Sequence, residues 1–184
     1  MRIRPLCISD VKLIEPVRLR DDRGWFCETY RKDLTAKAGI QHDFVQDNES
    51  CSVKAGTVRG LHFQIPPFAQ AKIVRVLKGA ILDVAVDLRR TSPTFLKHVA
   101  VRLDATTGEQ LYIPVGFAHG FCTLEDATII SYKVSAIYNR ECDRQVRWND
   151  PALAIAWPIA GGSAILSVKD GAAPTVAECD RLFD

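Results

Sequence analysis

The chain has 184 residues, which suits a single domain, 1–184, with a core large enough to need no disulfide bonds. Its 24 Lys and Arg residues nearly balance 22 Asp and Glu residues, giving a net charge of +2, and no basic block occurs, so nucleic acid is not an expected partner. Neither a signal-peptide pattern nor an apolar run of bilayer length is present, so we expect a cytoplasmic protein with no membrane partner.

Short segments rich in β-branched and aromatic residues recur between turn signals along the chain, which is typical of an all-β sandwich or barrel. One short helix is expected after the first strand, from an N-cap at Asp33 to a stop at Gly39. The predicted strands cover residues 24–30, 43–53, 57–64, 71–87, 97–103, 109–113, 118–124 and 127–136. Segment 71–87 divides into two strands at Lys78-Gly79, a tight-turn pair, and Lys72 is expected to face inward among valines.

From Trp148 onward the pattern predicts a loop-rich tail that is too short to form a second domain. This tail is interrupted at Asn149-Asp150-Pro151, Trp157-Pro158 and Gly161-Gly162. The predicted fold is therefore a single jelly roll with an N-terminal extension and an irregular C-terminal tail.

The segment Val58–Gln64 places an arginine and a histidine in an otherwise apolar strand. Successive side chains of an extended chain point to opposite faces, so His62 and Gln64 share one face and Arg59 lies on the other. A histidine in such a strand is more often a hydrogen-bonded core residue than a catalyst. His119 lies in a second apolar segment with the same character, and this repetition favours a functional site.

Inward-facing histidines in a jelly roll suggest a metal site, because metal-binding cupins combine two or three histidines with a carboxylate. The spacing argues against this interpretation, since neither His62 nor His119 has a second histidine close in sequence. The cysteines contain no C-x-x-C pair or zinc-type cluster, so we expect reduced structural thiols and no metal. They are Cys7, Cys27, Cys51, Cys122, Cys142 and Cys179.

Ten short motifs, spread over nearly the whole chain, carry a family resemblance. They are Asp22-Arg-Gly-Trp-Phe26 with Glu28, Phe44-Val-Gln-Asp-Asn48, Arg59-Gly-Leu-His-Phe-Gln64, Ala69-Gln-Ala-Lys72, Asp83-Val-Ala-Val-Asp87, Ser92-Pro-Thr-Phe95, Ile113-Pro-Val-Gly-Phe-Ala-His-Gly-Phe121, Tyr132-Lys133, Trp148-Asn-Asp150 and Lys169-Asp170. In this order they resemble the dTDP-4-dehydrorhamnose 3,5-epimerase family. The resemblance implies a cupin-like jelly-roll barrel with an N-terminal strand extension and a few short peripheral helices.

The resemblance also implies a reaction, performed without a cofactor. It is the conversion of dTDP-4-dehydro-6-deoxy-D-glucose to dTDP-4-dehydro-L-rhamnose, in dTDP-L-rhamnose biosynthesis for surface polysaccharide. The C4 ketone acidifies the hydrogens on C3 and C5, so a base can remove one of them while nearby donors and cations stabilise the enolate. The roles implied are His62 as the base with Asp170 as its partner, Tyr132 as the proton donor, and Lys72 as the cation beside the C4 oxygen.

The remaining implied residues bind the substrate. Arg59 and His119 are expected to contact the sugar and the diphosphate. Tyr138 is expected to stack on the thymine ring, although stacking alone does not select a base. Family members exchange N-terminal strands, which implies a homodimer in which Arg23 and Glu28 reach the neighbouring subunit's site and contact the nucleotide there. The other nucleotide contacts implied are Gln46, Asp47, Asn48, Asp143 and Lys169.

One conflict remains between strand alternation and the implied site. A regular strand puts Arg59 and His62 on opposite faces, so contact with one substrate requires a bulge or twist near Gly60. Departures from the family pattern also bear on binding, namely Trp25 and Cys27 where Phe is frequent, Asp143 where Glu is common, and an apolar segment 65–68.

Two alternatives stay open. The first is a relative that inverts only C3 or only C5, or that acts on another nucleotide's keto sugar. The second is a jelly roll that binds a sugar nucleotide without catalysis. Because His62 and Tyr132 are both present, the sequence favours double epimerisation. Because Lys72 is present as well, a non-catalytic role is disfavoured.

Overall fold

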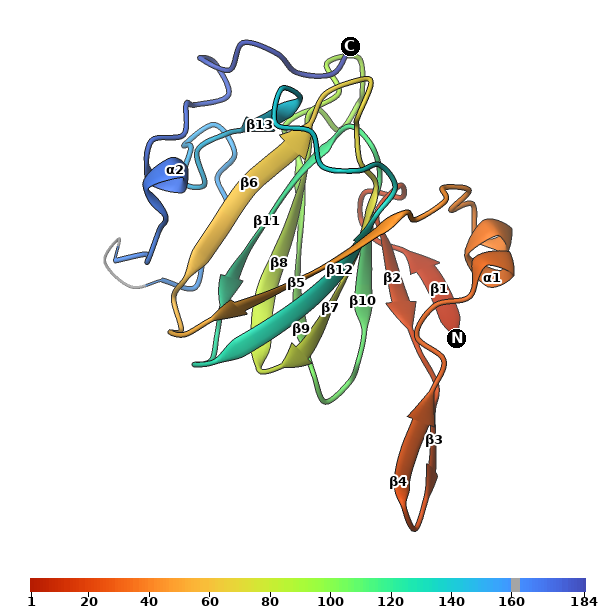
Figure 1. The fold of residues 1–184 in the computed structure, drawn as a ribbon. Helices are drawn as coiled ribbons and strands as arrows, with labels where there is room; N and C mark the ends of the chain where they lie inside the picture. Colours follow the sequence, from red (N-terminus) through yellow and green to blue (C-terminus); the bar gives the residue numbers. More distant parts are fainter. Residues whose placement is uncertain (160–162) are drawn as a thin grey trace.

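Two antiparallel sheets face each other in the computed structural model, which describes residues 1–159 and 163–184 (Figure 1). The six-stranded sheet contains, in spatial order, β1 (Arg2–Pro5), β2 (Lys12–Glu15), β10 (Gln110–Ile113), β7 (Lys72–Lys78), β12 (Thr128–Val134) and β5 (Gln46–Ser52). The five-stranded sheet contains β13 (Asp143–Gln145), β6 (Val58–Gln64), β11 (Phe117–Thr123), β8 (Ala80–Asp87) and β9 (His98–Asp104). The predicted all-β fold is confirmed.

The remaining elements are small. Strands β3 (Arg18–Asp21) and β4 (Gly24–Cys27) form a separate hairpin that projects away from the two sheets (Figure 1, dark orange). The helices are α1 (Lys32–Lys37) and α2 (Val168–Gly171). Helix α1 confirms the predicted helix, but Asp33 is not its N-cap. Arg31 occupies that position, and the Asp33 carboxylate accepts a hydrogen bond from Arg31 within the first turn, where the helix dipole favours a negative charge.

Every predicted strand segment overlaps an observed strand, from β4 to β12. The chain does turn at Lys78-Gly79, and Gly79 has the positive φ of +80° that suits glycine. However, β7 and β8 belong to different sheets, so this turn is a corner between the sheets and does not close a hairpin. Strands β1, β2, β3 and β13, which have three or four residues each, were not predicted.

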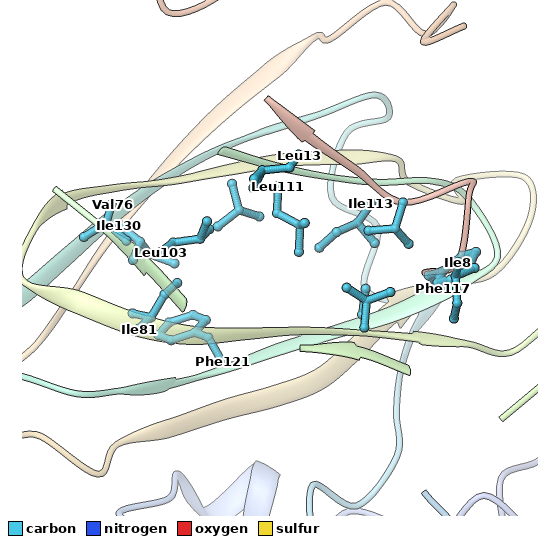
Figure 2. Packing of buried hydrophobic residues seen from close by; sticks show 14 residues of the cluster. Ile8, Leu13, Val76, Ile81, Leu103, Leu111, Ile113, Phe117, Phe121 and Ile130 are labelled. Atoms are coloured by element: carbon cyan, nitrogen blue, oxygen red, sulfur yellow. The ribbon is translucent and has the colours of Figure 1, made fainter. Parts of the chain in front are cut away.

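The main core lies between the sheets, as Figure 2 shows. Leu13, Leu111 and Ile113 extend from the six-stranded sheet towards Ile81 and Phe121 of the other sheet. Burial of each apolar side chain of this kind contributes about 1.5–3 kcal/mol to the stability of the fold. This apolar packing fills only part of the space between the sheets, and polar side chains line the rest.

A second apolar cluster covers the outer face of the five-stranded sheet. Here Leu61 and Phe63 of β6 pack with Leu153, Val176 and Phe183 of the loop-rich tail. The tail therefore packs against the outer face of the five-stranded sheet, and it places α2 beside β6 (Figure 1). The predicted break at Gly161-Gly162 lies outside the described residues.

A buried carboxylate at the end of β8 holds the loop that leads into β9. Asp87 accepts hydrogen bonds from Arg89 Nη2 at 2.7 Å, from Ser92 Oγ at 2.6 Å and from Thr94 Oγ1 at 2.6 Å. Burial opposes ionisation, but these bonds outweigh it and lower the pKa of Asp87 to about 2. The motif Ser92–Phe95 is thus explained by loop structure.

The Asp87→Asn variant is expected to lower the free energy of unfolding by about 3 kcal/mol at pH 7, because Arg89 loses its buried partner. The folded-state pKa lies below the unfolded value, so this stabilisation is complete above about pH 4 and is lost as the pH falls through about 2. Urea titrations of both proteins at several pH values would measure it. Asp126→Asn, at an exposed carboxylate, is the control, and a difference that does not shrink in acid would contradict the assignment.

Candidate active site

A polar cavity opens between the sheets where β5, β6 and β12 carry inward-facing polar side chains. It has two adjoining parts, of about 470 Å³ and about 270 Å³. Both parts are lined by His62, Lys72, Tyr132 and Lys169. The sequence-predicted base, cation and proton donor therefore meet in one cavity.

Strand β6 bulges where it borders this cavity. Its register with β11 shifts so that Gly60 and Leu61 both stand opposite Gly120. Gly60 has a φ of +135°, and a Cβ there would lie 2.5 Å from the Gly120 Cα atom, so only glycine fits. The extra residue reverses the alternation, and Arg59 and His62 line the same part of the cavity. The bulge predicted near Gly60 is confirmed.

His62 is paired with a buried carboxylate. Its Nε2 atom lies 2.5 Å from Asp170 Oδ1. Helix α2 supplies Asp170, and the N-cap residue Ser167 accepts from the Asp170 N–H at 3.0 Å and donates to Asp170 Oδ2 at 2.7 Å. Burial opposes ionisation of Asp170, but the hydrogen bonds from His62 and Ser167 outweigh it and lower its pKa. An ionised carboxylate selects the imidazole tautomer with its proton on Nε2, which leaves Nδ1 free to accept a proton.

Lys72 is buried beside this pair, which confirms the prediction that its side chain faces inward. The residue is only 8% exposed, and its Nζ atom donates to the His62 carbonyl at 3.4 Å. Burial lowers the pKa of Lys72 to about 8, against the charges of Asp143 and Asp83, which raise it. The cavity therefore contains an ammonium group that is charged at neutral pH and poorly solvated.

Tyr132 and Arg59 complete the narrower part of the cavity. Burial raises the pKa of the Tyr132 phenol, and the charge of Arg59 opposes this shift. Arg59 donates from Nε to Ser52 Oγ at 3.1 Å and from Nη2 to the Cys51 carbonyl at 3.0 Å. These bonds to β5 fix the guanidinium at the cavity wall.

A second imidazole–carboxylate pair lies deeper in the same wall. His119 Nε2 is 2.7 Å from Asp83 Oδ1, and both side chains are buried. Burial lowers the pKa of His119, although Asp83 opposes the shift. Asp83 Oδ2 is buried without a hydrogen-bond partner among the described residues. Sequence reasoning missed Asp83 as a site residue, although an aspartate inside the apolar run of β8 was an available signal.

The wider part of the cavity contains five of the residues predicted to bind the nucleotide. Tyr138 lies at its rim, 57% exposed, with its hydroxyl 3.2 Å from Asp143 Oδ2. The same carboxylate oxygen accepts from Lys169 Nζ at 2.6 Å. Gln46 and Asn48 project inward from β5, since alternate residues share a face.

Three predicted site residues lie elsewhere. Asp47 points to the opposite face of β5, where Lys133 Nζ lies 2.8 Å from its carboxylate. Arg23 is at the exposed tip of the β3–β4 hairpin, paired with Asp21. Glu28 follows that hairpin, 3.8 Å from Arg31. Within one chain, none of these three side chains lines the cavity.

No set of three His, Cys, Asp or Glu side chains within residues 1–159 and 163–184 is arranged to hold a metal ion. Over the same residues, none of the helices is long and apolar enough to cross a membrane. All six cysteines are free thiols, and Cys122, Cys142 and Cys179 are buried.

Comparison with known proteins extends the resemblance from motifs to the whole chain. A family model described as dTDP-4-dehydrorhamnose 3,5-epimerase matches residues 5–178. A dTDP-4-dehydrorhamnose 3,5-epimerase from Sinorhizobium fredii is 49% identical over 183 residues, covering 100% of this chain and 93% of the relative. A dTDP-4-dehydrorhamnose 3-epimerase from Streptomyces niveus is 41% identical over 179 residues, and the match covers 97% of this chain and 85% of the relative.

Structural comparison agrees. The crystal structure of a 3,5-epimerase from Legionella pneumophila, in complex with dTDP-4-keto-L-rhamnose, superposes with a TM-score of 0.90 and 42% identity. The match covers 96% of this chain and 93% of that one, which confirms the cupin-like jelly roll. On this evidence the chain belongs to the dTDP-4-dehydrorhamnose 3,5-epimerase family.

Proposed function

We propose that the protein is an isomerase that converts dTDP-4-dehydro-6-deoxy-D-glucose to dTDP-4-dehydro-L-rhamnose by inverting C3 and C5. One observation carries this proposal. The His62–Asp170 pair, the buried Lys72 ammonium and the Tyr132 phenol line one cavity. These groups are a base, a cation and an acid, which are what epimerisation next to a ketone needs.

In each half of the reaction, His62 Nδ1 removes a proton from the carbon next to the ketone. The electron pair of that C–H bond moves onto the C4 oxygen and gives an enolate. The Lys72 ammonium stabilises this negative charge, far better in a dry cavity than it would in water. Asp170 stabilises the imidazolium that forms on His62.

Tyr132 then protonates the carbon from the opposite face, which inverts the centre. Burial raises the pKa of this phenol, so it holds its proton until the enolate draws it. His62 and Tyr132 afterwards exchange protons with solvent. Solvent hydrogen therefore enters the product at each inverted carbon.

The wider part of the cavity is assigned to the nucleotide. Tyr138 stacks on the base, while Gln46, Asn48, Asp143 and Lys169 bind the polar groups around it. Arg59 and His119 contact the sugar and the diphosphate from the narrower part. Because nucleotide sugars are cytoplasmic metabolites, we infer a cytoplasmic location.

Proton NMR in deuterated buffer containing a chelator tests this function. The 4-keto sugar nucleotide is expected to acquire deuterium at both C3 and C5, with no metal required. Label at C3 alone would replace the proposal with the 3-epimerase activity named for the Streptomyces niveus relative. No label at either carbon would contradict the enzyme assignment.

The β3–β4 hairpin leads us to propose a homodimer. Three large apolar side chains of this hairpin are between 53% and 69% exposed, namely Leu19, Trp25 and Phe26. Exposed apolar side chains that gather on one element are typical of a surface that binds another protein. Arg23 lies in the turn between β3 and β4 and does not line the cavity of its own chain. The hairpin itself projects away from the two sheets (Figure 1). A neighbouring subunit that receives the hairpin would cover these apolar side chains and gain Arg23 and Glu28 for its own site.

Mixing two defective variants tests this exchange. Arg23→Ala and His62→Asn are each expected to be impaired at low substrate concentration. Coexpression with different tags should restore roughly a quarter of wild-type activity, because about half of the dimers are mixed and each mixed dimer has one of its two sites intact. If every chain used its own hairpin, the mixture would only average the two variants. Light scattering would independently measure the mass of a dimer.

A further inference from the structure

The loop that carries Tyr138 is held by glutamine side chains. Four consecutive residues of this loop, 136–139, each share a hydrogen bond with a glutamine. The bonds are Gln70 Nε2 to the Ala136 carbonyl at 2.7 Å, Gln64 Nε2 to the Ile137 carbonyl at 3.2 Å, the Tyr138 N–H to Gln46 Oε1 at 3.0 Å, and the Asn139 N–H to Gln64 Oε1 at 2.7 Å. We call these three residues the glutamine clamp.

The three members of the glutamine clamp come from different segments. Gln46 begins β5, Gln64 ends β6, and Gln70 lies in the connection between β6 and β7. The first belongs to the six-stranded sheet and the second to the five-stranded sheet. The loop is therefore fixed to both sheets.

The central glutamine has no alternative orientation. Gln64 is only 3% exposed, and besides its two bonds to the loop its Nε2 donates to the Phe68 carbonyl at 2.7 Å. Turning the amide over would place its oxygen against the Phe68 and Ile137 carbonyls and its NH2 group against the Asn139 N–H, which is costly. Gln46 is similarly committed, since its Nε2 donates to Asn48 Oδ1 at 2.7 Å.

The clamped loop presents apolar surface to solvent. Ile137 and Tyr138 are 56% and 57% exposed, and Tyr138 lines the wider part of the cavity. An exposed aromatic ring on a loop ordinarily samples several positions, and binding then requires it to be ordered. Here the backbone on both sides of the ring is already fixed.

We propose that Gln64 and Gln70 are positioning residues for the nucleotide, acting through Tyr138. With Gln46 they hold the Tyr138 ring as a preformed stacking surface for the base. This inference rests on the proposed function, because it assumes a nucleotide in the wider cavity. It assigns no role in proton transfer to the glutamine clamp.

The experiment is a double-mutant cycle on the affinity for dTDP, measured by calorimetry. Gln70→Met and Gln64→Met remove the amide and keep the side-chain length, and Gln70 is the safer site because it is only half-buried. Tyr138→Ala should weaken binding roughly tenfold or more, the range found when base stacking is removed. Gln70→Met should weaken it about fivefold by itself and add almost nothing to Tyr138→Ala, because both changes remove the same interaction.

Kinetics supply a second measurement. The loss should appear in KM while kcat changes by less than about twofold, since the clamp affects ground state and transition state alike. Gln41→Met, at an exposed glutamine outside the cavity, is the matched control and should leave the affinity for dTDP unchanged.

Three results would overturn the inference. Wild-type affinity in Gln70→Met and Gln64→Met would remove the role of the clamp. Fully additive losses with Tyr138→Ala would mean that the glutamines contact the nucleotide directly. A wild-type protein that does not bind dTDP would overturn the proposed function itself, and this outcome is distinct from the other two.

Discussion

Replacement of His62 by asparagine is expected to reduce exchange of the C3 and C5 hydrogens by roughly a thousandfold, the middle of the range for loss of a general base. Asparagine keeps a polar group of similar reach near Asp170 but cannot accept a proton from carbon. The measurement is the rate of deuterium incorporation at each carbon, followed by NMR. Exchange at the wild-type rate would show that another group is the base.

Three further variants distinguish the roles around His62. Asp170→Asn should also slow exchange strongly, because an amide no longer selects the productive imidazole tautomer. Tyr132→Phe should still permit proton removal, yet return the proton without productive inversion. His42→Asn, at a histidine that does not line the cavity, is the matched control and should exchange at the wild-type rate. If Tyr132→Phe formed the epimerised product normally, the proton donor would have to be reassigned.

The alternation of side chains along a strand explains which features of β6 could be predicted from the sequence and which required the family resemblance as well. The apolar pattern located the strand, and the demand that Arg59 and His62 reach one ligand predicted a bulge at Gly60. The same rule could have removed Asp47 from the cavity. Its neighbours Gln46 and Asn48 share a face of β5, so Asp47 must point away from them, towards Lys133.

Other features could not be predicted from local pattern. Helix α2 has only four residues, too few for helical periodicity, yet its N-cap Ser167 orients Asp170. The contact between Asp170 and His62 joins positions 108 residues apart, so only the packed tail brings them together. The glutamine clamp depends in the same way on the meeting of two sheets and one connection.

Replacement of Lys72 by methionine is expected to lower the activity of the protein and to raise its stability. Lys72→Met should reduce epimerisation at least about a hundredfold, because the enolate loses its buried cation. The same variant should be more stable than the wild type, since methionine has a similar length and avoids burying a charge. Its free energy of unfolding at pH 7 should rise by up to about 3 kcal/mol, the equivalent of lowering the pKa from 10.5 to about 8.

The pH dependence of this stability gain identifies its cause. Below about pH 8 Lys72 is protonated in both states, so the wild type bears the full cost of the buried charge. Between about pH 8 and pH 10.5 the folded protein releases this proton before the unfolded chain does, and the cost disappears. Urea titrations should therefore show an advantage of Lys72→Met at pH 7 that fades by about pH 10.5. An advantage that does not change with pH would indicate better packing by methionine.

Activity should follow the same proton in the opposite sense. The wild-type kcat/KM should fall as the pH rises through about 8, because the neutral amine cannot stabilise the enolate. Lys72→Arg separates charge from position, since a guanidinium stays protonated across this range. That variant should retain part of the activity and lose the decline near pH 8. A decline that persists in Lys72→Arg would assign it to another group and leave Lys72 without a titrating role.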